Sequence, residues 1–387
     1  MEKLKIFASI IDDATTNQIQ TLSQSDAYKD AIIRIMPDCH AGLGCTIGSV
    51  IQYTDRVVPN TVGVDIGCGM LVVELGNIDI NLERLDEAIN DLIPAGFHKV
   101  HDTPAGHFNL QSFNAPLKEK EYLQCSIGTL GGGNHFIELD IDDEDNKYLV
   151  IHSGSRYLGT QICEFWQNKA IERLTDDSAI RHELIDRLKA EGRLQDISKE
   201  LANIKKPNIN KELAYLEGQD LEDYIHDMIL CQEFADLNRN RIAELILFVM
   251  KIHNIQASFT TIHNYVDVPH KIIRKGAVSA QYGETLIIPM NMRDGSLICK
   301  GKGNEDWLCS APHGAGRIMS RKKAFDSLSL AEYKAEMSSI YTTSVCVETI
   351  DEAPMVYKPY DVIREDIKDT VDVVTAIRPI YNFKSKT

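Results

Sequence analysis

Candidate metal ligands on both sides of a helical stretch constrain the fold of this 387-residue chain more than any other feature. Asp65 and Cys68 are separated by two residues and flanked by glycines, so a carboxylate and a thiol can converge on one ion. Histidines follow in three further short motifs, at His135, His152 and His263. The helical stretch lies between His152 and His263. The parts of the chain on either side of it must therefore meet in space if these residues form one site.

Three parts follow one another along the chain. From 1 to about 160, short β-branched runs alternate with turns of Gly, Asn and Pro, which indicates strands. From about 161 to 255, glycine is scarce and apolar residues recur at helical spacing. Short strands return from Thr260 onward, and 371–378 is another candidate strand. We predict one α+β domain over 1–387, with a β-rich core, flanking helices and a helical insertion at about 161–255.

The formal net charge of −16 argues against a protein that coats nucleic acid non-specifically. Lysine and arginine gather between 274 and 323, however, next to a glycine-rich motif, which favours a phosphate-bearing ligand there. No stretch approaches the roughly 20 apolar residues needed to cross a bilayer, and the N-terminus lacks the apolar core of a secretion signal. We expect a cytoplasmic protein with no membrane partner. Nine cysteines without framework spacing predict reduced thiols, available to a metal.

The chemistry of the candidate ligands points to a transition metal. Taken singly, an Asp or Cys among glycines is more often a turn or core residue than a ligand. Together, thiolate and imidazole select ions such as zinc, iron or manganese, while a carboxylate and a thiol able to bridge suit a two-metal centre. The spacing alone leaves the identity of the ion open.

A second group of residues surrounds His313, in the stretch from Ser310 to Arg317. A histidine among small residues leaves a ring nitrogen accessible, and backbone amides beside glycines can approach a phosphate closely. Attack by imidazole on phosphorus divides one difficult displacement into two steps, and Arg317 would offset the charge. The alternative is a tight turn in which His313 bonds only to backbone.

Seven motifs, in the same order along the chain, closely resemble the RtcB family of RNA ligases. They are DCHAGLGCTIG (38–48), VGVDIGCGM (62–70), GTLGGGNHFIEL (128–139), HSGSR (152–156), HNY (263–265), RKGAV (274–278) and HGAGRIMSR (313–321). The resemblance extends from about residue 30 to the C-terminus. It implies a single-domain α+β fold and a GTP- and manganese-dependent enzyme. Such an enzyme joins an RNA 3′-phosphate or 2′,3′-cyclic phosphate to a 5′-hydroxyl, in tRNA splicing or RNA repair.

The resemblance also implies a role for each metal-type residue. Cys68 would bridge two Mn²⁺ ions, His135 and His152 would complete one site, and Asp65 and His263 would complete the other. A divalent ion on the phosphate oxygens neutralises developing charge and keeps the leaving group in line.

The resemblance makes His313 the nucleophile. Its imidazole would attack the α-phosphate of GTP, expel pyrophosphate and hold GMP through a phosphoramidate bond. Because a neutral imidazole is needed, activity should fall below its pKa. The RNA 3′-phosphate would then take the guanylyl group, forming RNA-3′-pp-5′-G, and the 5′-hydroxyl would displace GMP. Water activated by the same metal centre would first open a cyclic phosphate.

The resemblance also implies which residues of this chain contact the nucleotide and the RNA, by their positions in the shared motifs. The nucleotide-binding residues implied are Asn134, Phe136, Glu138, His313, Gly314, Ala315, Gly316 and Lys384, with Glu138 accepting from the guanine edge. The residues implied to hold RNA phosphates are Arg156, Arg317 and Arg321. Asn238 and Arg239 resemble a further family element, for which RNA contact is one interpretation.

Two positions depart from the family pattern. Many members carry Pro-Gly-Ser-Met-Gly where this chain reads Pro-Met-Asn-Met-Arg-Asp-Gly-Ser at 289–296, and Ile262 replaces a second histidine before the HNY motif. Asn291, Arg293 or Ser296 are the candidates to replace the missing serine. These changes suggest a divergent branch whose preferred RNA differs from spliced tRNA halves.

Two other function classes are alternatives to ligation. A metal-dependent RNA 2′,3′-cyclic phosphoesterase would use the same metal ligands without ligating, and the altered stretch at 291–294 favours it. It would need no GTP. A non-catalytic RNA-binding protein is the third class, but it has no reason to keep His313 together with every metal-type residue. The RNA substrate, any activating protein and the oligomeric state cannot be derived from these residues.

Overall fold

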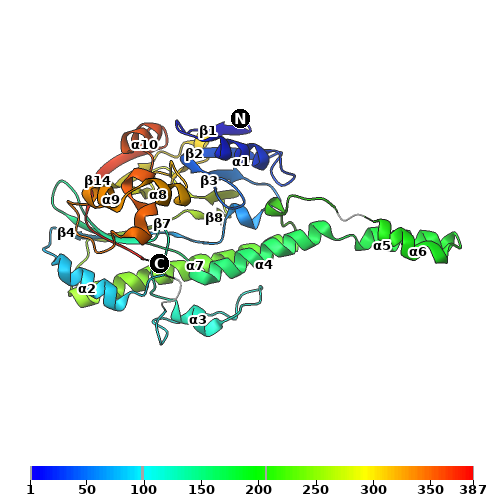
Figure 1. The fold of residues 1–387 in the computed structure, drawn as a ribbon, viewed down its shortest axis with the longest axis horizontal. Coiled ribbons are helices and arrows are strands. Elements are labelled where there is room, and N and C mark those ends of the chain that lie inside the picture. The colour runs from blue at the N-terminus through cyan, green and yellow to red at the C-terminus, as the bar shows by residue number, and fades with distance from the viewer. Residues whose placement is uncertain (1, 97–99, 205–206, 387) are drawn as a thin grey trace.

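The largest sheet among the described residues has seven antiparallel strands, some of which are labelled in Figure 1. The computed structural model describes residues 2–96, 100–204 and 207–386. Neighbouring strands of this sheet all pair antiparallel. In spatial order they are β11 (Thr285–Asn291), β12 (Gly295–Gly301), β14 (Val371–Lys384), β5 (Phe136–Ile141), β6 (Lys147–Ser153), β4 (Gly69–Gly76) and β7 (Ala257–Ile262).

A second sheet of five strands lies beside the first. Its spatial order is β1 (Leu4–Ile6), β2 (Ile32–His40), β3 (Ile47–Gln52), β9 (Ile272–Lys275) and β8 (Asn264–Asp267). Only the pairing of β1 with β2 is parallel among its described strands. A small antiparallel pair is formed by β10 (Ala277–Ser279) and β13 (Ser310–Pro312).

Helices surround the sheets. The α-helices of the described ranges are α1 (Asp13–Ser23), α2 (Leu82–Leu92), α3 (Lys120–Cys125), α4 (Arg156–Thr175), α5 (Ser178–Ala190), α6 (Ile197–Asn203), α7 (Gln219–Met250), α8 (Arg321–Ser327), α9 (Leu330–Glu336) and α10 (Tyr360–Asp366). The short 3₁₀ helices are η1 (Pro59–Thr61), η2 (Leu194–Asp196), η3 (Lys211–Leu213), η4 (Glu305–Trp307), η5 (Val347–Glu352) and η6 (Pro354–Val356).

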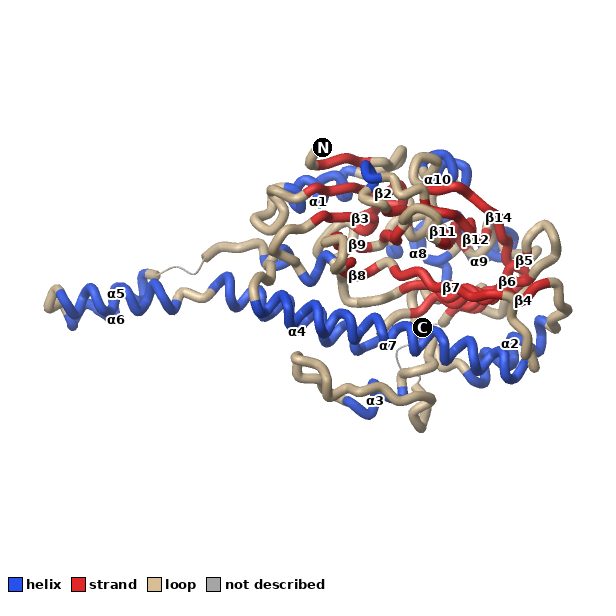
Figure 2. The backbone as a smooth tube through the Cα atoms, turned by 180° about the vertical axis from the view of Figure 1, so that it is seen from behind, coloured by secondary structure: helices blue, strands red, loops and turns tan. Residues whose placement is uncertain are grey.

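The long helix α7 supports the strands from one side. It runs beside α4 under the sheets, as both Figure 1 and Figure 2 show, and it contacts α2, β4, β6 and β8. Its buried residues recur every three or four positions, which gives the apolar stripe of a helix packed on a core. The helix ends at Met250 and is capped by Lys251, which adopts a left-handed conformation.

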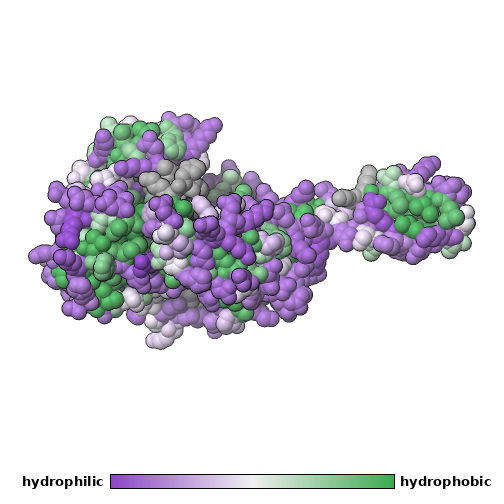
Figure 3. Space-filling model, turned by 90° about the horizontal axis from the view of Figure 1, so that it is seen from below, coloured by the Kyte–Doolittle hydropathy of each residue, from purple (hydrophilic) through white to green (hydrophobic). Residues whose placement is uncertain are grey.

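The helices α5 and α6 project away from the body as a short arm (Figures 1 and 2). They contact one another, and Figure 3 shows apolar surface on the arm. Ile180 of α5 and Leu194 of η2 are exposed. The arm lies within the stretch for which a helical insertion was predicted.

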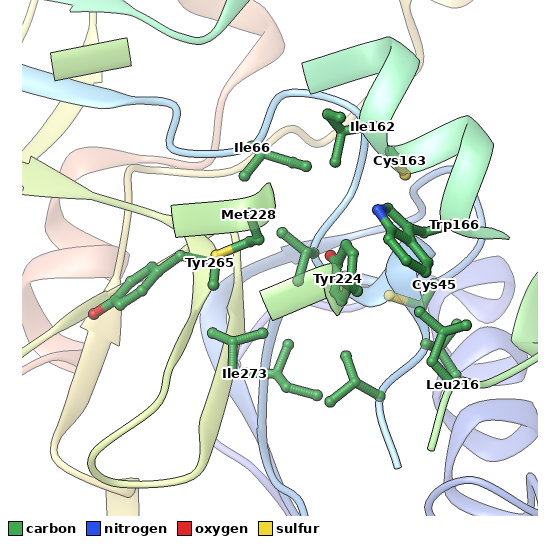
Figure 4. Close-up of a cluster of buried hydrophobic side chains, with 14 of the residues drawn as sticks. Cys45, Ile66, Ile162, Cys163, Trp166, Leu216, Tyr224, Met228, Tyr265 and Ile273 are labelled. Atoms are coloured by element: carbon green, nitrogen blue, oxygen red, sulfur yellow. The ribbon is translucent and has the colours of Figure 1, made fainter. Parts of the chain in front are cut away.

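A buried apolar cluster fixes the loop that carries Asp65 and Cys68. Ile66 of this loop is fully buried, and Figure 4 shows it in one cluster with Trp166 of α4 and Met228 of α7. The loop is therefore held by the core on one side and by the start of β4 on the other.

Mixed helices and antiparallel strands in one body confirm the predicted α+β class. Within the described ranges, no helix combines the length and the apolar character that a membrane span requires.

Candidate metal centre and nucleotide cavity

The five candidate metal ligands converge where the ends of four neighbouring strands of the seven-stranded sheet meet. Cys68 immediately precedes β4, His135 immediately precedes β5, His152 lies in β6 and His263 follows β7. Strand β4 pairs with both β6 and β7, while β5 pairs with β6, so these strand ends are neighbours. Asp65 comes from the loop before β4. The antiparallel strand order therefore brings together residues that are up to about 200 positions apart.

The ligand atoms form two groups that share Cys68. The Cys68 Sγ lies 3.3 Å from His135 Nε2 and 3.3 Å from His152 Nε2. His135 Nε2 lies 3.0 Å from Asp65 Oδ2. One group is Asp65, Cys68 and His135, the other is Cys68, His152 and His263, and the potential ligand atoms of each group lie within 4.8 Å of one another.

This grouping corrects the pairing implied by the family resemblance. His135 groups with Asp65 rather than with His152, and His152 groups with His263. The reason is the strand order: β4 lies between β6 and β7, so His152 and His263 approach the start of β4 from its two sides. Cys68 is the shared residue, as expected.

The protonation states of these residues suit a cation. Burial lowers the pKa of His152 and of His263 well below the ordinary value, so both rings are neutral and can donate a lone pair. Burial opposes charge on Asp65, but the hydrogen bond and charge of His135 outweigh it, and the pKa of Asp65 is lowered. Burial raises the pKa of the Cys68 thiol, which a bound cation would reverse.

These residues fit a divalent transition metal. The Nδ1 atoms of His152 and His263 are buried without a hydrogen-bond partner in the described structure. Metal bonds of about 2.0–2.3 Å to nitrogen and sulfur would span the 3.3 Å separations around Cys68. A mixed set of carboxylate, thiolate and imidazole suits one ion or a pair that shares the thiolate.

His313 lies next to this centre and is oriented by Asp38. It follows β13, and its ring centroid is 4.8 Å from that of His263. The His313 Nδ1 lies 2.5 Å from Asp38 Oδ2, and the His313 backbone N–H donates to the same oxygen at 3.2 Å. Asp38 is fully buried in β2. If Nδ1 carries the proton that Asp38 accepts, the lone pair is left on Nε2.

The glycine at 316 allows this approach of two distant segments. Gly316 has a φ of +75°, and a Cβ there would lie 2.1 Å from the backbone oxygen of Asp38. The turn interpretation of His313 is therefore incomplete, since its side chain binds a buried carboxylate. Sequence reasoning missed Asp38 as a functional residue, although it begins the first motif of the family resemblance.

A cavity of about 920 Å³ adjoins His313 and His152. All the residues that the resemblance implied for nucleotide binding line it, namely Asn134, Phe136, Glu138, His313, Gly314, Ala315, Gly316 and Lys384. The cavity is large enough for a nucleotide.

Glu138 supplies a buried carboxylate to this cavity. Asn382 Nδ2 donates to Glu138 Oε1 at 2.6 Å, and burial raises the pKa of Glu138 to about 7. Asp140, two residues along the same strand, is fully buried and both of its carboxylate oxygens lack a partner among the described residues. Burial raises the pKa of Asp140 as well. Because Glu138 and Asp140 are two positions apart in a strand, the two acids lie on the same face of β5.

Lys384 is one of several cationic residues that line the cavity. Its position in β14 is opposite Phe136 of β5, and its Nζ lies 5.5 Å from the centre of the Phe136 ring. Lys384 Nζ also lies 3.0 Å from Glu352 Oε2 and donates to the Asn134 carbonyl at 3.3 Å. Burial opposes charge on Glu352, but Lys384 and Arg317 together lower its pKa to about 2.

The three arginines expected to hold RNA phosphates surround the site, but all have protein partners. Arg156 Nη1 lies 3.1 Å from His135 Nδ1. Arg317 binds Glu352 at 3.1 Å, with its side chain only 13% exposed. Arg321 pairs with the Asp351 carboxylate at 3.1 Å and is 56% exposed, which makes it the most accessible of the three.

The altered stretch at 289–296 is held by its own hydrogen bonds. The Asn291 side chain donates to Asp294 at 2.8 Å and accepts from the backbone N–H of Arg293 at 3.0 Å. Arg293 also pairs with Glu336. The Ser296 hydroxyl is buried without a partner among the described residues and does not line the cavity.

Asn238 and Arg239 do not reach solvent. Both are fully buried on the face of α7 that meets the sheet. RNA contact is therefore the wrong interpretation for this pair.

Comparison with known proteins points to a single family. The family model described as tRNA-splicing ligase RtcB matches residues 18–123 and 103–385. The chain is 31% identical to the RNA-splicing ligase RtcB of Escherichia coli K12, over 96% of this chain and 94% of that protein. It is 27% identical to RtcB2 of E. coli ATCC 25922, over 90% and 87%. It is 24% identical to the tRNA-splicing ligase RtcB of Nanoarchaeum equitans, over 98% and 93%.

Proposed function

Because this chain belongs to the RtcB family of tRNA-splicing RNA ligases, we propose that it joins RNA ends in a GTP- and Mn²⁺-dependent reaction through a guanylated His313. Its substrates are RNA 3′-phosphate or 2′,3′-cyclic phosphate ends and 5′-hydroxyl ends, in tRNA splicing or RNA repair. One catalytic domain with a helical insertion carries the activity. Nine free cysteines suit a reducing compartment, so a cytoplasmic location is part of the proposal.

The contact between His313 and Asp38 is the observation that carries this proposal. With the ring proton on Nδ1, Asp38 accepts it across 2.5 Å, and the Nε2 lone pair is left to attack the α-phosphorus of GTP. An Nε2–P bond forms as the bond from phosphorus to the pyrophosphate oxygen breaks. The buried carboxylate of Asp38 stabilises the positive charge that develops on the ring.

The cavity suits a guanine nucleotide. Guanine presents N1–H and an exocyclic amine along one edge, and the ionised carboxylate of Glu138 would accept from both. The ring of Phe136 offers an apolar surface for the base. Lys384, close to that ring, adds positive charge to the same wall.

The metal-type residues would hold two Mn²⁺ ions. Asp65 and His135 would bind one ion, His152 and His263 would bind the other, and Cys68 would bridge them. When bound, the ions would neutralise charge on the phosphate oxygens and keep the leaving group in line. His263 is adjacent to His313, so this stabilisation would act where the nucleophile attacks.

In the second half of the reaction, an oxygen of the RNA 3′-phosphate attacks the guanylated His313 and breaks the P–N bond. The product is RNA-3′-pp-5′-G. The 5′-hydroxyl of the second RNA then attacks the 3′-phosphate, and GMP leaves. Arg321, at the exposed rim, is the arginine best placed to bind RNA phosphate, while Arg156 and Arg317 would act from more buried positions.

The phosphoesterase alternative depended on the altered stretch at 291–294. The side chains of Asn291 and Arg293 bond to Asp294 and Glu336 rather than to any metal-type residue. The stretch therefore gives no specific support for hydrolysis without ligation.

An RNA-joining assay tests the proposed substrates. The protein is incubated with Mn²⁺, GTP and a split RNA that carries a 3′-phosphate and a 5′-hydroxyl. We expect joined RNA that depends on GTP, and none from the matched RNA with a 3′-hydroxyl and a 5′-phosphate. Cleavage of a cyclic phosphate without joining, at saturating GTP, would favour the phosphoesterase instead.

A further inference from the structure

Arg239 of α7 connects the two segments that hold the shared thiol and a histidine of the metal centre. Its Nη1 donates to the Gly67 carbonyl at 2.9 Å and to the Ser153 carbonyl at 3.0 Å. Gly67 directly precedes Cys68, and Ser153 directly follows His152. One guanidinium nitrogen thus fixes the backbone next to two candidate ligands that lie 3.3 Å apart.

The adjacent Asn238 forms hydrogen bonds to the segment that leads to His135 and to the segment that follows His152. Its Oδ1 accepts from the backbone N–H groups of Gly128 and Thr129, at 2.8 and 3.1 Å. Its Nδ2 donates to the Thr129 carbonyl at 3.1 Å and to the Ser153 Oγ at 3.0 Å. The Gly154 carbonyl is a further acceptor at 3.2 Å. The amide therefore accepts from and donates to the 128–129 segment, and it donates to the segment that follows His152.

A short hydrogen-bond chain extends from Asn238 to a candidate ligand. The Ser153 hydroxyl, which accepts from Asn238, donates to the Leu130 carbonyl at 2.8 Å. The same carbonyl lies 3.0 Å from His135 Nδ1. A carbonyl in this position fixes the ring orientation and leaves Nε2 for a metal.

The burial of both residues argues for a specific role. Asn238 and Arg239 are fully buried, and a buried guanidinium is unfavourable unless its surroundings compensate for it. Arg239 Nε and Nη2 have no hydrogen-bond partner in the described structure, although the Asp236 carboxylate lies 3.6 Å from Nη2. An apolar side chain would fill this space without that penalty.

We propose that Asn238 and Arg239 are positioning residues of the metal centre. Arg239 sets the spacing of Cys68 and His152, and Asn238 holds the segments of His135 and His152 together. The inference rests on the proposed function only insofar as the five ligands must bind metal. It assigns neither residue to RNA.

Cobalt binding to the full-length protein tests this inference. Co²⁺ replaces other divalent ions in mixed thiolate and imidazole sites, and its sulfur-to-metal absorption band reports the Cys68 bond directly. The variants are Arg239→Met, which removes the donors, and Arg239→Lys, which restores a positive donor. Asn238→Asp keeps the shape and the acceptor but loses the donated bonds. Arg34→Met is the matched control.

Arg34 is a suitable control because it is also fully buried and also donates to backbone carbonyls. It binds the Glu2 carbonyl at 3.0 Å and the Ile33 carbonyl at 2.9 Å, in the five-stranded sheet. None of the candidate metal ligands is among its partners. Its replacement should lower thermal stability without altering the metal centre.

We expect Arg239→Met and Asn238→Asp to weaken Co²⁺ and Mn²⁺ binding by about 10–100-fold and to shift the sulfur-to-cobalt band. Arg239→Lys should recover part of both losses, and Arg34→Met should bind as the wild type does. Wild-type affinity and an unchanged band in folded Arg239→Met and in Asn238→Asp would overturn the inference. If Arg239→Met does not fold, the same result in Asn238→Asp alone overturns it. A wild type that shows no sulfur-to-cobalt band would instead contradict the proposed metal centre itself.

Discussion

The Nδ1 atom of His313 lies 2.5 Å from the Oδ2 atom of Asp38, a residue 275 positions earlier in the chain. Asp38 belongs to β2 and is fully buried, whereas the His313 side chain retains 15% exposure toward the cavity. A buried acceptor on one ring nitrogen determines which nitrogen is free to react. A nucleophilic histidine would need such a contact, whereas a histidine that only shapes a turn would not.

Replacing Asp38 with Asn should slow guanylation of His313 by about 10²–10⁴-fold. Asp38 orients the imidazole and fixes its tautomer, and a correctly placed proton in catalysis contributes on that scale. An Asn amide can donate to Nδ1 and thereby place the ring proton on Nε2. The initial rate of GMP transfer from labelled GTP measures the effect. Asp227→Asn is the control, because Asp227 is equally buried and binds Trp166 and the Asn114 backbone. A guanylation rate that Asp38→Asn leaves unchanged would contradict the role of Asp38.

Guanosine binding should weaken as the pH falls from 8 to 6. Glu138 has a pKa raised by burial to about 7, so lower pH protonates it and removes the acceptor for the guanine N–H groups. Isothermal titration with guanosine, which carries no titrating phosphate, isolates this effect. Glu138→Gln should bind more weakly at pH 8 and show little pH dependence. Equal guanosine affinity of the wild type at pH 6 and pH 8 would argue against guanine recognition by Glu138.

Metal content should separate the two groups of ligands. The wild type should bind two Mn²⁺ ions per chain, and Cys68→Ala should lose both because both groups share its thiol. The double variant Asp65→Ala/His135→Ala should keep one ion, whereas Asp65→Ala/His152→Ala should keep none. Elemental analysis after gel filtration measures the ratio, and Cys163→Ser, a buried cysteine outside both groups, is the control. Loss of both ions from the first double variant would contradict the grouping.

Glu352→Gln should destabilise the protein by about 3–5 kcal/mol, the usual effect of removing one partner of a buried ion pair. It would leave Lys384 and Arg317 without the carboxylate that both contact at about 3 Å. Urea unfolding measures the free-energy change. Asp143→Asn, which breaks the exposed contact with Arg378, should change stability little. An equally small loss of unfolding free energy in both variants would contradict the stabilising role of the Glu352 ion pairs.

The sequence revealed the local parts of the site. Glycines within two positions of Cys68, His135 and His313 mark segments where the backbone turns tightly around a reactive side chain. All three residues lie at the metal centre or at the cavity. The α+β class followed from strand-like runs on either side of a helical stretch, and the structure confirms it.

The pairing of ligands and the burial of α7 could not be predicted in the same way. The partner of His152 depends on the position of β4 between β6 and β7, which no local motif encodes. The family resemblance gives RNA contact as one interpretation of Asn238 and Arg239, but the helix turns both of them toward the sheet. The contact of Asp38 with His313 joins β2 to the loop that follows β13 and is visible only in the fold.

Guanylation of His313 is the most direct test of the central claim. The full-length protein is incubated with Mn²⁺ and GTP labelled at the α-phosphate, then denatured and resolved on a gel. We expect wild-type protein to retain acid-labile label, as a phosphoramidate would, and His313→Ala to retain none while binding the same amount of metal. Absence of label on wild-type protein that contains both metal ions would contradict the account.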